Sequence, residues 1–470
     1  MNRPIYLDYQ ATTPLAPEAA AAMRPWLETG FANPHSSHRI GREAAAAIEV
    51  ARDHVVAALV AGGGVSSARS EADDHLHSSR AKSSGDCTQS EPAPLDYARD
   101  ERVQASAHQG GGAGGESGPV ADLRSSRAKS RGDCTGSEPA PLDYARDERE
   151  WASAPVPSGR LYFTSGATEA ANWALKGAAA RLPEGRRRIV TVATEHACVL
   201  DTAEWLGRQG FEVELLPVDT DGLVDPDLVA GRVDERTGLV AAMLVNNEIG
   251  VIQPVAEIGR IARERGALFF CDAVQGLGRV TVPLGACDMV AVSAHKVHGP
   301  KGIGALWVRE GVEIEPLLHG GGQEGGLRSG TLSPALCVGF GEAARLLAER
   351  RQEDAAHVAR LWEVATGLLD GWTINGSADR RYLGNLNVRR DGIDSARLIS
   401  EVRQVAFSSG SACASGSGRP SHVLSAIGLA GSESRSSIRL GFGRYTGEED
   451  LRGALGLIVQ CAERQGRWPA

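Results

Sequence analysis

The chain has 470 residues, of which 42% are hydrophobic and 23% are charged; this is typical of a folded globular protein with room for more than one domain. The net charge of -9 argues against a nucleic-acid ligand, because phosphate binding needs a clustered basic surface. We expect basic runs such as Arg186–Arg188 to lie on solvated faces. No apolar run approaches the roughly 18 residues of a spanning helix, and the first residues lack a signal-peptide layout. We therefore expect a cytoplasmic protein without membrane contact.

The eight cysteines are scattered along the chain and form no CxxC pair. This spacing matches neither a disulfide framework nor a zinc site, so we expect no bound metal. At least one of the eight cysteines could therefore be a reactive thiol.

One segment departs from globular composition. The 25 residues from Ser78 to Arg102 return as Ser125 to Arg149, with 23 of 25 positions identical. Two packed copies would meet different neighbours and diverge, so near-identity indicates a recent duplication rather than a solenoid repeat. The surrounding sequence is rich in Gly, Ser and charge, which cannot offset the entropy of ordering. We expect residues 62–158 to be a disordered insertion.

Outside the insertion, apolar runs alternate with segments of helical period. Strand-like runs are RLYFTS, RRIVTVA, FEVELLPV, GLVAAMLV, ALFFCDAV, MVAVSA and GALWVR, and helix-like segments include ATEAANWALKGAAA, CVLDTAEWLGRQG and VAEIGRIARERG. This alternation predicts an α/β fold with helices on both faces of a sheet. Ligands of such sheets bind where the strands end.

The predicted strand ends carry a set of polar residues. GATEAAN follows the first strand and starts a helix, whose free N–H groups and the Thr168 hydroxyl are suited to a phosphate; taken alone, it is an ordinary helix start. His196 begins the next helix, where a lone histidine is more often a cap or a surface residue. Asn247, Asp272 and Gln275 follow further strands, and SAHK places Ser293, His295 and Lys296 after MVAVSA.

Together these residues fit one cofactor, pyridoxal phosphate. It needs a lysine for a Schiff base, an acid for the pyridine nitrogen and a cradle for the phosphate. Lys296 supplies the first and Asp272 the second. His196 is suited to covering the ring and moving protons. The phosphate cradle would come from Ala167, Thr168, Ser293 and His295.

Ten motifs together resemble the cysteine desulfurases of the NifS/IscS type, in the class V aminotransferase group of pyridoxal phosphate enzymes. They are LDYQATTP, NPHSSH, FTSGATEAAN, TEHACVLDT, NNEIG, DAVQ, SAHKVHGPKGIGAL, GGGQEGGLRSGT, SSGSACASG and SSIRLGFGRYT. The resemblance implies the aspartate aminotransferase-like fold of type I. A large domain with a mixed, mostly parallel sheet would span 15–61 and 159–352, and a smaller α+β domain 1–14 and 353–470.

The resemblance implies a role for each matching position around the ring. Lys296 matches the Schiff-base lysine, Asp272 the partner of the pyridine nitrogen, and His196 the stacked acid/base. Asn247 and Gln275 match residues that hydrogen-bond the ring oxygen of the cofactor.

The phosphate and the substrate have matching positions too. The phosphate cup corresponds to Ala167, Thr168, Ser293 and His295. Thr331 matches a residue that reaches the phosphate of the other subunit, which implies a homodimer. Arg439 matches the clamp for the substrate carboxylate, assisted by Asn33. Gln10 stands where the family more often has a smaller residue.

Cys413, in SSGSACASGSGRPSH, is the distinguishing position. Its flanks of Ser, Gly and Ala predict a mobile loop, which suits a thiol that attacks inside the site and carries its product outward. A small buried cysteine is the better interpretation of the other seven. The resemblance implies that L-cysteine is converted to L-alanine while Cys413 becomes a persulfide, whose sulfur passes to acceptor proteins for iron-sulfur cluster assembly or thiolation.

Other interpretations stay open. The enzyme could prefer selenocysteine, or catalyse transamination or β-elimination as other class V enzymes do, although Cys413 argues against the latter two. The chain could also be a non-catalytic scaffold with the insertion as its interaction segment. The presence of Lys296, Asp272, His196 and Cys413 together argues against that, because a scaffold needs none of them.

Overall fold

The computed structural model describes residues 3–61, 157–410 and 421–466, which all lie in one compact unit. Nearly all of the predicted insertion at 62–158, and the predicted catalytic Cys413, lie outside these ranges. Within them, no helix has both the length and the apolar character needed to cross a membrane.

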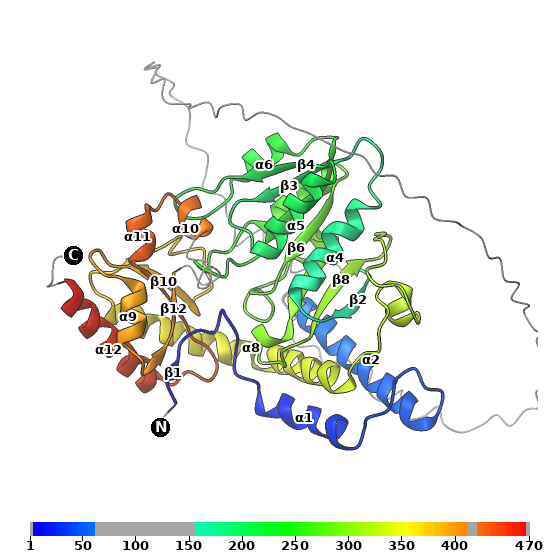
Figure 1. Cartoon of the computed structure of the whole chain (residues 1–470), viewed down its shortest axis with the longest axis horizontal. Helices are drawn as coiled ribbons and strands as arrows, with labels where there is room; N and C mark the ends of the chain where they lie inside the picture. The colour runs from blue at the N-terminus through cyan, green and yellow to red at the C-terminus, as the bar shows by residue number, and fades with distance from the viewer. Residues whose placement is uncertain (1–2, 62–156, 411–420, 467–470) are drawn as a thin grey trace, which may run out of the picture. The chain divides into compact units, whose positions relative to one another are not determined.

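A seven-stranded sheet confirms the predicted α/β fold (Figure 1). Its strand order is β2-β8-β7-β6-β5-β3-β4. The strands are β2 (Gly159–Thr164), β3 (Arg188–Val192), β4 (Glu212–Leu216), β5 (Thr237–Met243), β6 (Leu268–Asp272), β7 (Met289–Ser293) and β8 (Gly304–Arg309). Strands β3 to β7 pair in parallel, whereas β8 is antiparallel to both β2 and β7. The sheet is therefore mixed and mostly parallel, as expected.

Helices cover both faces of this sheet because its strands are apolar on both sides. Phe270 packs in one core with α4 (Ala167–Ala179) and α5 (Ala197–Arg208). Its neighbour Phe269 packs in another with α2 (Arg39–Val60), α7 (Val255–Glu264) and α8 (Pro334–Leu368). The remaining helical elements around this sheet are α1 (Pro17–Glu28), α6 (Pro226–Arg232), η1 (Leu284–Ala286), η2 (Ala294–Lys296) and η3 (Gln323–Gly326).

The C-terminal part forms a second sheet with its own core. Its antiparallel order is β12-β13-β10-β9, from β9 (Thr373–Ile374), β10 (Asn385–Arg389), β12 (Ser408–Ser409) and β13 (Ser437–Gly441). A short parallel pair joins β1 (Ile5–Tyr6) to β11 (Val405–Ala406). The helices here are α9 (Ser395–Glu401), α10 (His422–Ala426), α11 (Gly431–Arg435) and α12 (Glu448–Gly466). Leu7 packs into this core, although the domain boundaries stay a prediction.

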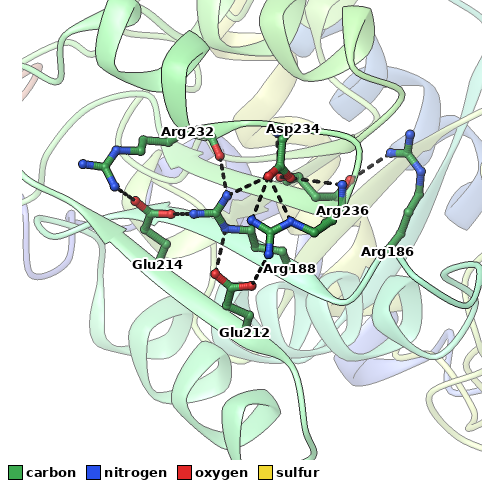
Figure 2. Close-up of polar contacts among 8 residues, drawn as sticks. Arg186, Arg188, Glu212, Glu214, Arg232, Asp234 and Arg236 are labelled. Atoms are coloured by element: carbon green, nitrogen blue, oxygen red, sulfur yellow. Dashed lines mark hydrogen bonds and ion pairs between the residues drawn. The ribbon is translucent and has the colours of Figure 1, made fainter.

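The expectation that Arg186–Arg188 is a solvated face is wrong for Arg188, which is buried at the start of β3. Figure 2 shows its guanidinium among Glu212, Glu214 and Asp234. These three carboxylates offset the cost of burying the charge. Because Glu212 and Glu214 lie on the neighbouring edge strand β4, the cluster ties that strand to β3.

Candidate active site

A cavity of about 650 Å³ lies where strands of the seven-stranded sheet end. This is the edge at which an α/β sheet binds its ligands. Residues of the N-terminal segment, including Gln10 and Thr12, complete its wall. Ten of the predicted site residues line it: Ala167, Thr168, His196, Asn247, Asp272, Gln275, Ser293, His295, Lys296 and Arg439.

One end of the cavity is built to hold an anion. Helix α4 begins at Ala167, directly after Gly166, so its first N–H groups have no partner within the helix. Gly304 packs against this turn so closely that a Cβ there would lie 2.7 Å from the carbonyl carbon of Gly166. Thr168 and Ser293 bring hydroxyl groups to the same cavity. Backbone donors and hydroxyls of this kind suit a phosphate.

Lys296 ends η2, immediately after β7. Its Nζ donates to the carbonyl oxygens of Gln10 and Ala11, the latter at 2.9 Å. His295 beside it contacts Thr12 Oγ1 through Nδ1 at 3.1 Å. Burial, with help from the nearby Lys296 charge, lowers the pKa of His295 to about 4. His295 is therefore neutral at pH 7 and adds no charge beside the lysine.

Asp272 is buried at the end of β6 and accepts a hydrogen bond from the Val274 backbone N–H at 2.9 Å. Burial raises the pKa of Asp272, while His196 and Lys296 oppose that shift. A carboxylate in this position is stabilised by any further cation that enters the cavity. The protonated ring nitrogen of pyridoxal phosphate is such a cation.

His196 is both the cap of a helix and a wall of the cavity. Its Nδ1 accepts the Cys198 backbone N–H at 3.1 Å, as the N-cap of α5. Burial lowers the pKa of His196, so the ring is neutral. Because a backbone N–H can only donate, Nδ1 is the bare nitrogen and Nε2 carries the proton. The two interpretations of this histidine, as cap and as acid/base, are thus compatible.

These residues fit pyridoxal phosphate on their own chemistry. The cavity combines a lysine amine, a buried carboxylate, a neutral histidine and an anion site at a helix start. Within the described ranges, no group of three or more His, Cys, Asp or Glu could hold a metal ion. The lysine, the buried carboxylate and the anion site match an organic cofactor that carries a phosphate.

Arg439 lies on β13 and is 1% exposed. Its Nη2 pairs with Asp8 Oδ1 at 2.7 Å, and its Nη1 donates to the Asn247 carbonyl at 2.9 Å. The guanidinium is thereby fixed at the cavity wall. Sequence reasoning predicted Arg439 but missed Asp8, although a buried arginine calls for an acid and LDYQATTP places one after an apolar residue.

Gln275 is held by two residues that sequence reasoning did not assign to the site. Its Nε2 donates to the Gln10 carbonyl at 2.9 Å, and its Oε1 accepts a hydrogen bond from Arg279. Arg279 Nη2 also donates to the Lys296 carbonyl at 2.6 Å. The Gln10 side chain donates from Nε2 to the Gly384 carbonyl at 2.8 Å. Arg279 and the Gln10 backbone therefore position Gln275 and Lys296.

Two predicted residues lie away from the cavity wall. Asn33 is exposed, and its side chain caps the His35 backbone N–H at 2.9 Å. Thr331 is exposed as well. The described cysteines Cys198, Cys271, Cys287, Cys337 and Cys461 are all buried, as expected. Of these five, Cys198 is the one that lines the cavity.

The Aminotransferase class-V family model matches residues 146–453. Cysteine desulfurase IscS of Rickettsia bellii (strain OSU 85-389) is 36% identical over 464 residues, which cover 97% of this chain and 90% of that protein. The chain belongs to the cysteine desulfurases of the class V aminotransferase family. This confirms the resemblance found in the sequence.

Solved structures agree with the family and its fold. A NifS-like protein matches with a TM-score of 0.72 and 28% identity, over 98% of this chain and 100% of its own. A structure described as SspA in complex with cysteine matches with a TM-score of 0.67 and 29% identity, over 94% of this chain and 100% of its own. The fold of this class V enzyme is therefore the fold type I expected from sequence.

Proposed function

We propose that this enzyme converts L-cysteine to L-alanine and moves the sulfur to Cys413. The observation that carries the proposal is the single cavity in which Lys296, Asp272, His196 and Arg439 meet. A relative named cysteine desulfurase and a similar structure described with bound cysteine support the same substrate. The anion site, the acid and the lysine in one cavity also argue against a scaffold.

Residues that line this cavity of about 650 Å³ would hold the cofactor. Asp272 would pair with the ring nitrogen, and Asn247 and Gln275 would hydrogen-bond the ring oxygen. The phosphate would lie at the start of α4, near Ser293. Thr331 of a second subunit would reach the same phosphate, which makes the active form a homodimer. When bound, pyridoxal phosphate supplies an electron sink next to the substrate α-carbon.

The chain's own residues bind the substrate and move protons. Arg439, fixed by Asp8, binds the substrate carboxylate through its remaining N–H groups, with Asn33 as a proposed assistant. The amine of Lys296, which lies in the same cavity, would act as the base that takes the α proton. His196 presents its protonated Nε2, so it first acts as a donor and becomes a base only after losing that proton.

The sulfur step needs a thiolate, and we assign it to Cys413, which lies outside the described residues. Its sulfur attacks the substrate sulfur, the carbon–sulfur bond breaks, and a persulfide forms while the substrate carbon is protonated to alanine. The persulfide sulfur would pass to a cytoplasmic acceptor protein for iron-sulfur cluster assembly or thiolation. For Cys198, burial raises the thiol pKa, which argues against it as the nucleophile.

Product release from L-cysteine tests the proposal when a thiol reductant is present. The parent enzyme should release alanine and sulfide in equal amounts. The Cys413→Ser variant should keep the bound cofactor and lose both products, whereas the matched Cys198→Ser variant should keep both. Pyruvate and ammonia in place of alanine would instead favour β-elimination, and faster turnover of selenocysteine would favour the selenocysteine reaction.

A further inference from the structure

A second cavity, of about 180 Å³, shares Lys296 with the first. It lies between residues of the seven-stranded sheet's loops, such as Arg279, and residues of α8 and the C-terminal part, such as Arg351 and Tyr382. None of the roles proposed above uses it.

Its wall has a strong excess of positive charge. Among the described lining residues it has a single acid, Asp354, and four arginines: Arg279, Arg351, Arg381 and Arg444. Burial and the nearby Arg444 and Arg279 charges lower the pKa of His298, which also lines the cavity, to about 3. This histidine is therefore neutral, and it does not itself add to the charge.

Asp354, the one acid among the described lining residues, already forms an ion pair. Asp354 pairs with Arg444, with Nη2 to Oδ2 at 2.6 Å and Nε to Oδ1 at 3.1 Å. In the described part of the chain, the hydrogen bonds of Arg279, Arg351 and Arg381 go to neutral oxygens instead, such as the Lys296, Ala61 and Ile249 carbonyls. Neutral acceptors complete the hydrogen bonds of a buried guanidinium, but they do not compensate its positive charge.

Two guanidinium nitrogens of this wall, Arg444 Nη1 and Arg381 Nε, have no hydrogen-bond acceptor within the described ranges. Arg444 Nη1 is buried without a hydrogen-bond partner, on a side chain that is 2% exposed. Burial also lowers the pKa of Arg381 to about 10, in agreement with an unmet charge. A buried donor left unsatisfied costs free energy that a bound acceptor would recover.

We propose that this cavity binds a small inorganic oxyanion of the sulfate or phosphate class, held by Arg444, Arg279 and Arg381. Guanidinium forks match the paired oxygens of such ions. The volume of about 180 Å³, against about 650 Å³ for the cofactor cavity, suits a small ion rather than a second cofactor.

The site is joined to the catalytic lysine through one side chain. Arg279 donates to the Lys296 carbonyl at 2.6 Å and to Gln275 Oε1. A bound anion would hold Arg279 and Arg444 together, and with them the segments that follow β6 and β13. The bound anion would therefore stabilise these two segments, the first of which contacts Lys296 through Arg279.

Thermal unfolding of the full-length holoenzyme tests binding of sulfate to the second cavity. The holoenzyme is used because the phosphate of bound pyridoxal phosphate keeps sulfate out of the anion site at the start of α4. Sodium sulfate is titrated against sodium chloride at equal ionic strength. A site predicts a midpoint that rises saturably with sulfate, whereas general exclusion of the salt from the surface gives a rise without saturation.

Three variants assign the effect to the cavity. Arg444→Gln should weaken sulfate binding about tenfold or more, the loss expected for a charged hydrogen bond. Arg351→Gln at the half-exposed rim should weaken it less, and it serves if Arg444→Gln does not fold. Arg360→Gln, an exposed position on the same helix α8, should bind sulfate like the parent enzyme.

Crystals of the holoenzyme grown with selenate should show an anomalous peak beside Arg444. A midpoint that rises without saturation, equal sulfate affinity in Arg444→Gln, Arg351→Gln and Arg360→Gln, or selenate at the surface alone would overturn the proposal.

Discussion

Arg439 Nη2 lies 2.7 Å from Asp8 Oδ1, across 431 positions of sequence. The contact joins β13 to the segment that follows β1 and fixes the guanidinium at the wall of the cofactor cavity. Arg439 Nε is buried without a hydrogen-bond partner among the described residues, so Asp8 is the main compensation for the buried charge. One pair thus serves both the stability of the fold and the proposed substrate site.

Replacing Asp8 by alanine should lower the free energy of unfolding by about 3 kcal/mol, because it leaves a buried charge without its partner. It should also raise the KM for L-cysteine, since Arg439 loses the group that orients it. Urea unfolding and steady-state kinetics measure the two effects. The exposed Glu204, paired with Arg208 on α5, provides the control Glu204→Gln, which should change neither. Normal stability of Asp8→Ala would refute the assignment.

Gly304→Ala should weaken cofactor binding. A Cβ at Gly304 would lie 2.7 Å from the carbonyl carbon of Gly166 and from the Val292 oxygen, so the turn before α4 must move. We expect the apparent Kd of pyridoxal phosphate to rise about tenfold, which is ~1.4 kcal/mol, in an absorbance titration of the apoenzyme. Gly231→Ala is the matched control, because its Cβ would meet nothing within 4 Å. Equal affinity of both variants would show that the close approach is not needed.

The raised pKa of Glu195 should make the free energy of unfolding fall as the pH rises. Burial raises its pKa from 4.5 to about 8, with a smaller contribution from Asp272. The native state therefore holds a proton that the unfolded state releases, and the stability from this group is lost as the pH rises from 4.5 to about 8. Glu195→Gln mimics the protonated form, so its stability relative to the parent should rise by about 1.4 kcal/mol per pH unit in this window. A difference independent of pH, measured by urea unfolding, would contradict this.

The lowered pKa of His298 should give the opposite pH dependence, so that the free energy of unfolding falls as the pH falls. Burial is the largest cause that lowers its pKa from 6.5 to about 3, followed by the charge of Arg444. Between these values the unfolded state binds the extra proton, so the stability from this group is present above pH 6.5 and is lost on acidification. His298→Asn tolerates the left-handed backbone at φ 67°. It should flatten the pH dependence between pH 4 and 6 by about 1.4 kcal/mol per unit; an unchanged slope would disprove the shift.

Local patterns predicted the elements of the large sheet well, because apolar runs such as ALFFCDAV fill buried strands on both faces. The antiparallel direction of β8 had a weaker signal. Ten residues separate Ser293 from Gly304, and a parallel crossover needs about a dozen or more. Loop length, rather than the run GALWVR itself, sets the direction of β8.

The residues at strand ends that line the cavity were predictable, whereas the residues that support them were not. Lys296 and Asp272 follow apolar runs and carry recognisable chemistry. Asp8 and Arg279 act through contacts with residues far away or through backbone oxygens, which leave no local pattern. Arg188 shows the same limit, since its charged neighbours come from β4 and from the segment that follows α6.

Sulfur labelling of the holoenzyme tests the central claim most directly. The enzyme is incubated with ³⁵S-labelled L-cysteine without reductant, digested, and its labelled peptides are identified by mass spectrometry. We predict that the label lies on the Cys413 peptide and leaves it on reduction, as a persulfide does. Label on the Cys198 peptide, or alanine formed without any labelled peptide, would contradict the proposed sulfur transfer.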